Sequence, residues 1–99
     1  MRFEQLEYLI EISKQGSISS AAKKLHLSHQ ALSIAIKNLE EELGVLLLIR
    51  SVKGTSLTDE GKQIIAATQE FFYKLDKVTQ NFKSVNFQGT LNIAGTNLA

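Results

Sequence analysis

The feature that most constrains the fold is a pair of short amphipathic segments, each beginning directly after a serine. Ser17 precedes the first segment, Ile18–Leu25, and Ser28 precedes the second, His29–Leu43. A serine caps a helix in this position because its hydroxyl accepts a hydrogen bond from a free backbone N–H group of the first turn. The pattern therefore predicts two helices joined by a tight turn, the arrangement of a helix-turn-helix.

The residues around the predicted turn favour a close crossing of the two helices. Ala21, Ala22 and Leu25 are expected to face inward, and the small alanine side chains let the helices approach each other. His26 stands where the turn requires a positive φ, which histidine adopts at less cost than most residues. We therefore expect His26 to have a structural role and Leu27 to pack the turn into the core.

Two further elements flank this pair. Helical spacing predicts a helix from about Arg2 to Lys14 that ends at Gly16. The residues expected to face inward are Phe3, Leu6, Leu9, Ile10 and Ser13, widened by Tyr8 and Ile12, and in the later helix Leu32, Ala35, Ile36, Leu39 and Leu43. Val45–Leu57 predicts a β-hairpin, or wing, because Gly54 suits its tight turn. A purely structural hairpin is the alternative, but Arg50 and Lys53 near its tip favour contact with phosphates.

The last predicted element is a long helix that Thr58 caps and that continues to about Val85. Its apolar positions alternate in spacing between four and three, as in a coiled coil, and are Ile64, Thr68, Phe71, Leu75, Val78, Phe82 and Val85. Roughly 27 residues at about 1.5 Å each give a rod of about 40 Å, too long to bury against so small a body. We therefore expect a homodimer through this helix. The alternative is a helix that covers its own domain, as Ile65 and Phe72 are expected to do.

Composition places the chain in a broad class. Its 99 residues are 43% hydrophobic and 21% charged, which fits a soluble globular domain with one long element. The sequence contains no run of about 18 apolar residues, so no transmembrane helix is expected. The N-terminal residues lack the apolar stretch of a signal peptide, so a cytoplasmic location is expected. The absence of cysteine excludes disulfides and thiolate metal sites.

The distribution of charge is more informative than the net charge of +1. No aspartate or glutamate lies between Ile12 and Leu39, where lysines, serines and amides are frequent. A helix that faces a polyphosphate is expected to lose carboxylates and to keep such donors. We therefore expect His29–Leu43 to enter the major groove of DNA by its first turns. The alternative is a solvated surface on which the charges are segregated by chance.

Several motifs in order resemble the N-terminal part of LysR-type transcriptional regulators. They are the run Gly16–Ser33, Ile36-Lys37-Asn38-Leu39-Glu40, Leu43-Gly44, Arg50 and Leu57-Thr58-Asp59-Glu60-Gly61, and the resemblance covers about residues 1–95. It implies a mostly α fold, with a winged helix-turn-helix DNA-binding domain at 1–57 and a dimerising linker helix at 58–86. It also implies that 87–99 opens an effector domain that is otherwise missing, so this tail is expected to be disordered or extended.

The resemblance also implies a set of site residues. Those expected to face DNA are Ser28, His29, Gln30, Ser33, Ile34 and Lys37, and those expected to hold phosphates are Ser17, Ser19, Arg50, Ser51 and Lys53. Lys23 and Lys24 are expected to neutralise further phosphates. The implied partners are double-stranded DNA and a second copy of the chain, with dimer and tetramer both open, and no cofactor is implied.

Four positions depart from the family pattern. His29 stands where glutamine is more frequent, Gln30 where proline or serine is, and Leu48 where phenylalanine is usual. Ile34, which is often polar in the family, can only touch a thymine methyl group or rest on the backbone. The first two departures predict a different base preference.

Two other classes of function are alternatives to DNA binding. A protein-interaction module with a coiled-coil arm requires the basic window to be accidental. An enzyme is disfavoured because the chain has no cysteine, both histidines lie in one turn region, and the acid-free window offers no carboxylate to pair with them.

Overall fold

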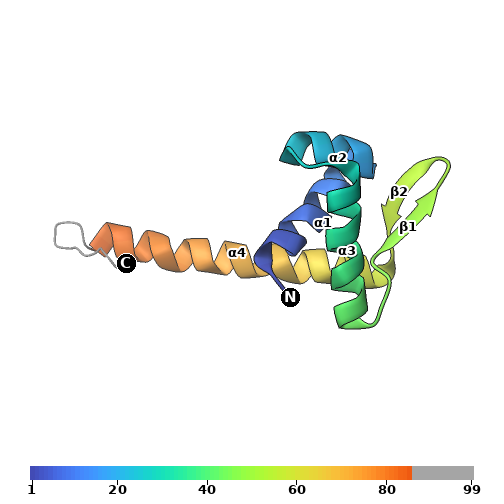
Figure 1. Cartoon of the computed structure of the whole chain (residues 1–99). Helices are drawn as coiled ribbons and strands as arrows, with labels where there is room; N and C mark the ends of the chain where they lie inside the picture. The colour runs from blue at the N-terminus through green and yellow to red at the C-terminus, as the bar shows by residue number, and fades with distance from the viewer. Residues whose placement is uncertain (86–99) are drawn as a thin grey trace. The chain divides into compact units, whose positions relative to one another are not determined.

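The computed structural model describes residues 1–85, in which three helices are followed by a hairpin and a long helix (Figure 1). Their bounds are Phe3–Gln15 for α1, Ile18–Leu25 for α2, His29–Leu43 for α3, Leu48–Ser51 for β1, Gly54–Leu57 for β2 and Asp59–Val85 for α4. This order confirms the mostly α, winged helix-turn-helix class, and α2 and α3 have the predicted bounds. The expected start of an effector domain at 87–99 lies outside the described residues.

The chain divides into two units after Thr68, within α4. Residues 1–68, which we call the body, contain α1–α3, the hairpin and the first turns of α4. The boundary falls later than residue 58, where the sequence places the start of the linker, because Ile65 is buried in the core of the body. The functional division between 1–57 and 58–86 therefore stays a prediction.

Local hydrogen bonds fix the ends of the short helices. Ser17 Oγ accepts from the backbone N–H of Ser20 at 3.1 Å, and Ser28 Oγ accepts from that of Ala31 at 3.0 Å. His26 has a φ of 60°, in the left-handed region, and its N–H closes the last turn of α2. The predicted caps and the positive φ of the turn are thus confirmed.

The core of the body lies between α1, α2 and α3. Its largest fully buried side chains are Leu9, Ile12, Leu32, Ile36, Leu39 and Leu47. The prediction was wrong for Phe3 and Ser13, which are exposed. The buried stripe of α1 runs from Leu6 through Leu9 to Ile12. Phe3 lies in the first turn of the helix and Ser13 in the last, beyond the two ends of this stripe.

The wing is an antiparallel pair in which Leu48 faces Leu57 and Ser51 faces Gly54. Backbone N–H groups of the hairpin and its entry also bond outside the sheet. The Glu40 carboxylate, on α3, accepts from the backbone N–H groups of Leu47 at 2.8 Å and Leu48 at 3.2 Å. On the other strand, the N–H of Thr55 donates to the carbonyl oxygen of Gly16 at 3.0 Å. Hydrogen bonds from both strands, and from Leu47 just before the first strand, therefore fix the position of the wing against α3 and the end of α1.

Helix α4 begins in close contact with the segment that leads into the wing. Thr58 Oγ1 accepts from the N–H of Gly61 at 3.0 Å and donates to the carbonyl oxygen of Leu46 at 2.7 Å. The N–H of Thr58 donates to the carbonyl oxygen of Leu47 at 3.0 Å. A Cβ atom added at Gly61 would overlap that same carbonyl oxygen and press on the Leu57 side chain. A residue without a side chain is therefore required where α4 passes Leu47.

Gly61→Ala tests this close approach. Alanine in place of glycine would by itself favour a helix by about 1 kcal/mol. We expect the overlap with the backbone of Leu47 to reverse the sign and lower the free energy of unfolding by about 1–3 kcal/mol. Urea unfolding followed by circular dichroism measures the change, with the exposed Gln63→Ala on the same helix as the control. A Gly61→Ala protein as stable as the wild type would show that α4 can move away from Leu47 at no cost.

Candidate nucleic-acid interface

Helix α3 separates a buried face from a polar one. Leu32, Ile36 and Leu39 point into the core and expose none of their surface. The opposite side presents Gln30 and Lys37 to solvent, together with Ile34, which is 50% exposed, and His29 is exposed at the start of the helix. The residues that the sequence places against DNA are thus accessible, except that Ser33 is half-buried; Ser28, which caps the helix, is exposed.

The predicted phosphate contacts from α2 have a simple arrangement. Ser19, Lys23 and Lys24 are exposed, and both lysines lie in the last turn of the helix. Ser17 is half-buried and its oxygen is engaged by the cap. No acidic residue occurs in the first turn of α2 or of α3, so no carboxylate there opposes an anion.

One wing residue that the sequence assigns to phosphate contact, Arg50, bonds directly to α3. The Nη1 group of Arg50 donates to Ser33 Oγ at 3.0 Å, across 17 residues of sequence. Nearer the tip, Ser51 Oγ donates to the carbonyl oxygen of Gly54 and accepts from the N–H of Lys53, both at 3.3 Å. Ser51 therefore shapes the turn, whereas Arg50 and Lys53 keep charged groups on the surface.

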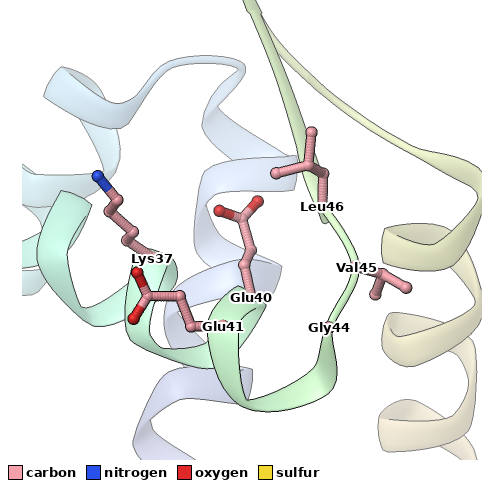
Figure 2. A pocket seen from close by; sticks show the side chains of 6 residues that line it. All are labelled: Lys37, Glu40, Glu41, Gly44, Val45 and Leu46. Carbon is pink, nitrogen blue, oxygen red and sulfur yellow. The ribbon is translucent and has the colours of Figure 1, made fainter.

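Two depressions adjoin α3. The first, of about 340 Å³, lies between α3 and the wing and is lined by Ser33, Lys37, Glu40, Leu46, Leu48 and Arg50. The second, of about 300 Å³, lies at the C-terminal end of α3 and is lined by Lys37, Glu40, Glu41, Gly44, Val45 and Leu46 (Figure 2). In Figure 2 the Glu40 carboxylate points toward the chain at Leu46, while the Lys37 side chain extends the other way. Glu40 is a residue to which the sequence analysis gave no role.

The predicted dimerisation seam on α4 is only partly available. Thr68 is 7% exposed and donates its hydroxyl to the carbonyl oxygen of Ile64 at 2.7 Å, and Ile64 is half-buried against the core of the body. Their own chain already covers much of both side chains, and their part in the dimer seam stays a prediction. Phe71, Leu75, Val78 and Phe82 are exposed, and the side chain of Val85 is not described. Phe72 is half-buried and packs edge to face on Phe71.

Other kinds of site find no support in the part of the chain that the structure describes. Within residues 1–85, no three histidine, aspartate or glutamate side chains are grouped so that they would hold a metal ion. Over the same range, no helix combines the length and the hydropathy that crossing a membrane requires.

Comparison with known sequences decides the family. Residues 3–62 match the family described as bacterial regulatory helix-turn-helix protein, lysR family. The chain belongs to the LysR family. The match spans α1 through the first turn of α4, which is the part of this LysR-family chain that contains the helix-turn-helix and the wing.

Relatives cover nearly all of this LysR-family chain. The HTH-type transcriptional regulator BsdA of Bacillus subtilis is 35% identical over 97% of this chain and 34% of its own length. CrgA of Neisseria meningitidis serogroup B, also an HTH-type transcriptional regulator, is 34% identical over 91% of this chain and 31% of its own. The chain thus spans about a third of the length of the curated relatives it matches.

Solved structures of the family have the same fold. The BenM_DBD/benA site 1 DNA complex is 30% identical, with a TM-score of 0.76, and covers 87% of this chain and 100% of that one. The CbnR_DBD–DNA complex is 31% identical, with a TM-score of 0.73, and covers 85% of this chain and 97% of that one. Both neighbours are complexes with DNA.

Proposed function

We propose that this chain is the DNA-binding portion of a transcriptional regulator, and that it binds double-stranded DNA sequence-specifically as a homodimer. The observation that carries the proposal is the accessible surface of α3, which presents Gln30 and Lys37 opposite a fully buried stripe and exposes His29 at its start. Polar groups on the first turns of such a helix suit entry into the major groove. The DNA complexes of the two solved relatives support the same conclusion. A regulator of this kind works in the cytoplasm, where the DNA is.

Base recognition is assigned to the first turns of α3. Gln30 is exposed and carries the amide that makes a bidentate contact with adenine, and His29 can donate to an acceptor of guanine. Ile34 offers an apolar contact to a thymine methyl group. Each bidentate contact with the correct base discriminates by about 1–3 kcal/mol.

Affinity is assigned to the cations that surround these residues. Lys23 and Lys24 on α2, Lys37 on α3, and Arg50 and Lys53 on the wing are all exposed. Cations at these positions release counterions from the phosphate backbone, so binding weakens as the salt concentration rises.

Gln30→Ala and Lys37→Ala separate recognition from affinity. On a duplex selected from a random pool, we expect Gln30→Ala to lose about 10-fold to 100-fold in affinity, with little loss on a scrambled duplex. Lys37→Ala should weaken both duplexes to a similar extent and reduce the slope of log affinity against log salt by about 1. Fluorescence anisotropy titrations at four salt concentrations measure both effects. Equal losses on the two duplexes for Gln30→Ala would contradict its role in base recognition, and no binding even at low salt would contradict the proposed function.

A further inference from the structure

One side chain of α3 bonds to the backbone at the entry of the wing. Glu40 is half-buried, and its Oε2 atom accepts from the backbone N–H of Leu47 at 2.8 Å and from that of Leu48 at 3.2 Å. Hydrogen bonds to an ionised acceptor are roughly twice as strong as neutral ones. The Glu40 carboxylate therefore ties α3 to the beginning of β1.

A second tether of the wing lies on the other strand. Thr55, which pairs with Arg50 in the hairpin, donates its N–H to the carbonyl oxygen of Gly16 at 3.0 Å. A Cβ atom added at Gly54 would come within 2.9 Å of the same oxygen, so the hairpin lies close against the end of α1. One such contact leaves a hairpin able to pivot, whereas two contacts on different strands fix its orientation. The second tether consists of backbone atoms alone, so Glu40 is the tether that depends on a side chain.

The carboxylate of Glu40 is committed to the wing although a cation lies on the same helix. Lys37 is three positions earlier on α3, a spacing at which opposite charges on a helix can pair. Among residues 1–85, however, neither of the two takes part in an ion pair. In Figure 2 the Lys37 side chain extends away from the Glu40 carboxylate. The position of this carboxylate therefore serves the entry of the wing and not the lysine.

The anchored segment leads directly to a cation of the proposed interface. Arg50 lies two residues beyond Leu48 on β1, and its Nη1 group donates to Ser33 Oγ on α3 at 3.0 Å. The wing orientation that Glu40 fixes is thus the one in which Arg50 reaches α3. A hairpin that pivoted at its entry would move this guanidinium group away from the helix.

We propose that Glu40 is a positioning residue for DNA binding, an inference that rests on the proposed function. Glu40 does not contact the duplex itself. It holds the wing so that the cations Arg50 and Lys53 face the same duplex as α3. The property required at this position is an oxygen acceptor, because both bonds come from backbone N–H groups. Glutamine keeps such an oxygen, whereas methionine has a stem of similar length and only a weak acceptor.

Glu40→Met and Glu40→Gln test whether the acceptor is what matters. On a duplex selected from a random pool, we expect Glu40→Met to lose about 10-fold in affinity and to reduce the slope of log affinity against log salt by about 1 to 2, because the phosphate contacts of the wing are weakened. Glu40→Gln should stay within about 3-fold of the wild type, since it still accepts from both N–H groups. Fluorescence anisotropy titrations measure the affinities, and circular dichroism sets a temperature at which every variant is fully folded.

A double-mutant cycle provides a readout that a loss of stability alone would not change. In a chain that already carries Arg50→Ala and Lys53→Ala, Glu40→Met should cost less than about 2-fold in affinity, because the cations that Glu40 positions are absent. The proposal is overturned if the loss from Glu40→Met multiplies with the loss from those two substitutions. It is also overturned if Glu40→Gln binds as weakly as Glu40→Met, because an oxygen acceptor would then not be sufficient.

Glu41→Met is the matched control, since it removes the same charge from the next residue of α3. Glu41 is exposed, and its side chain forms no hydrogen bond or ion pair within the part of the chain that the structure describes. We expect its affinity to stay within about 2-fold of the wild type, because exposed charges are screened by salt. Equal losses from Glu41→Met and Glu40→Met would refute the positioning role. Failure of the wild-type chain to select any duplex would instead refute the proposed function, and the role of Glu40 with it.

Discussion

Leu75→Asp should separate the dimer into monomers and lower the affinity for a two-fold symmetric duplex by about 100-fold or more. Leu75 is 47% exposed at the middle of the predicted seam on α4, with Val78 exposed one turn further on. An aspartate buried there would place unpaired carboxylates in an apolar interface between the two copies. Two linked reading helices bind two half-sites together, so a monomer loses the gain that comes from the second site.

Sedimentation velocity and anisotropy titrations measure the two consequences on the same protein. Tyr73→Asp is the control, because Tyr73 is 63% exposed on the same helix but lies about 200° around it from Leu75. We expect Tyr73→Asp to remain dimeric and to bind as the wild type does. A Leu75→Asp protein that stays dimeric at micromolar concentration, or a Tyr73→Asp protein that dissociates equally, would exclude the seam as the dimer interface.

Features decided by neighbouring residues could be predicted from the sequence. The caps at Ser17 and Ser28, the positive φ at His26 and the glycine that ends α1 each depend on hydrogen bonds within about five residues. For that reason α2 and α3 begin and end where the sequence predicted. The exposed polar face of α3 follows from the same periodicity that identifies its buried stripe.

Features decided by distant residues could not be predicted. The Glu40 carboxylate bonds to the entry of the wing, Arg50 bonds to Ser33, and Gly16 accepts from Thr55, and none of these pairs has a signature in local spacing. The burial of Thr68 was missed for another reason. A heptad pattern is the same whether an apolar face packs on its own domain or on a second copy. Spacing alone therefore does not say at which residue α4 stops packing on its own domain and becomes available to a second copy.

Helix α3 contains two isoleucines, one buried and one exposed, whose substitution by alanine is expected to have different effects on stability and on binding. Ile36 on α3 is completely buried, so Ile36→Ala leaves a cavity in a small core formed by α1–α3, the start of the wing and the first turns of α4. We expect the free energy of unfolding to fall by about 2–5 kcal/mol. A domain of this size has about 5–10 kcal/mol in total, so the melting temperature should fall by about 10 °C or more. Differential scanning calorimetry measures this change.

Ile34→Ala, two residues earlier on α3, is the matched control for both stability and binding. Ile34 is 50% exposed, and alanine is the better helix former, so we expect stability to change by less than about 0.5 kcal/mol. Because its side chain lies on the face that we assign to the major groove, the same substitution should weaken binding to a selected duplex that has thymine at the contacted position. Ile36→Ala, measured well below its melting temperature, should instead retain the sequence preference, since it does not reach the surface. If both substitutions destabilised the fold equally, the two faces of α3 would not differ as the burial indicates; if neither affected binding, the apolar contact of Ile34 with DNA would be wrong.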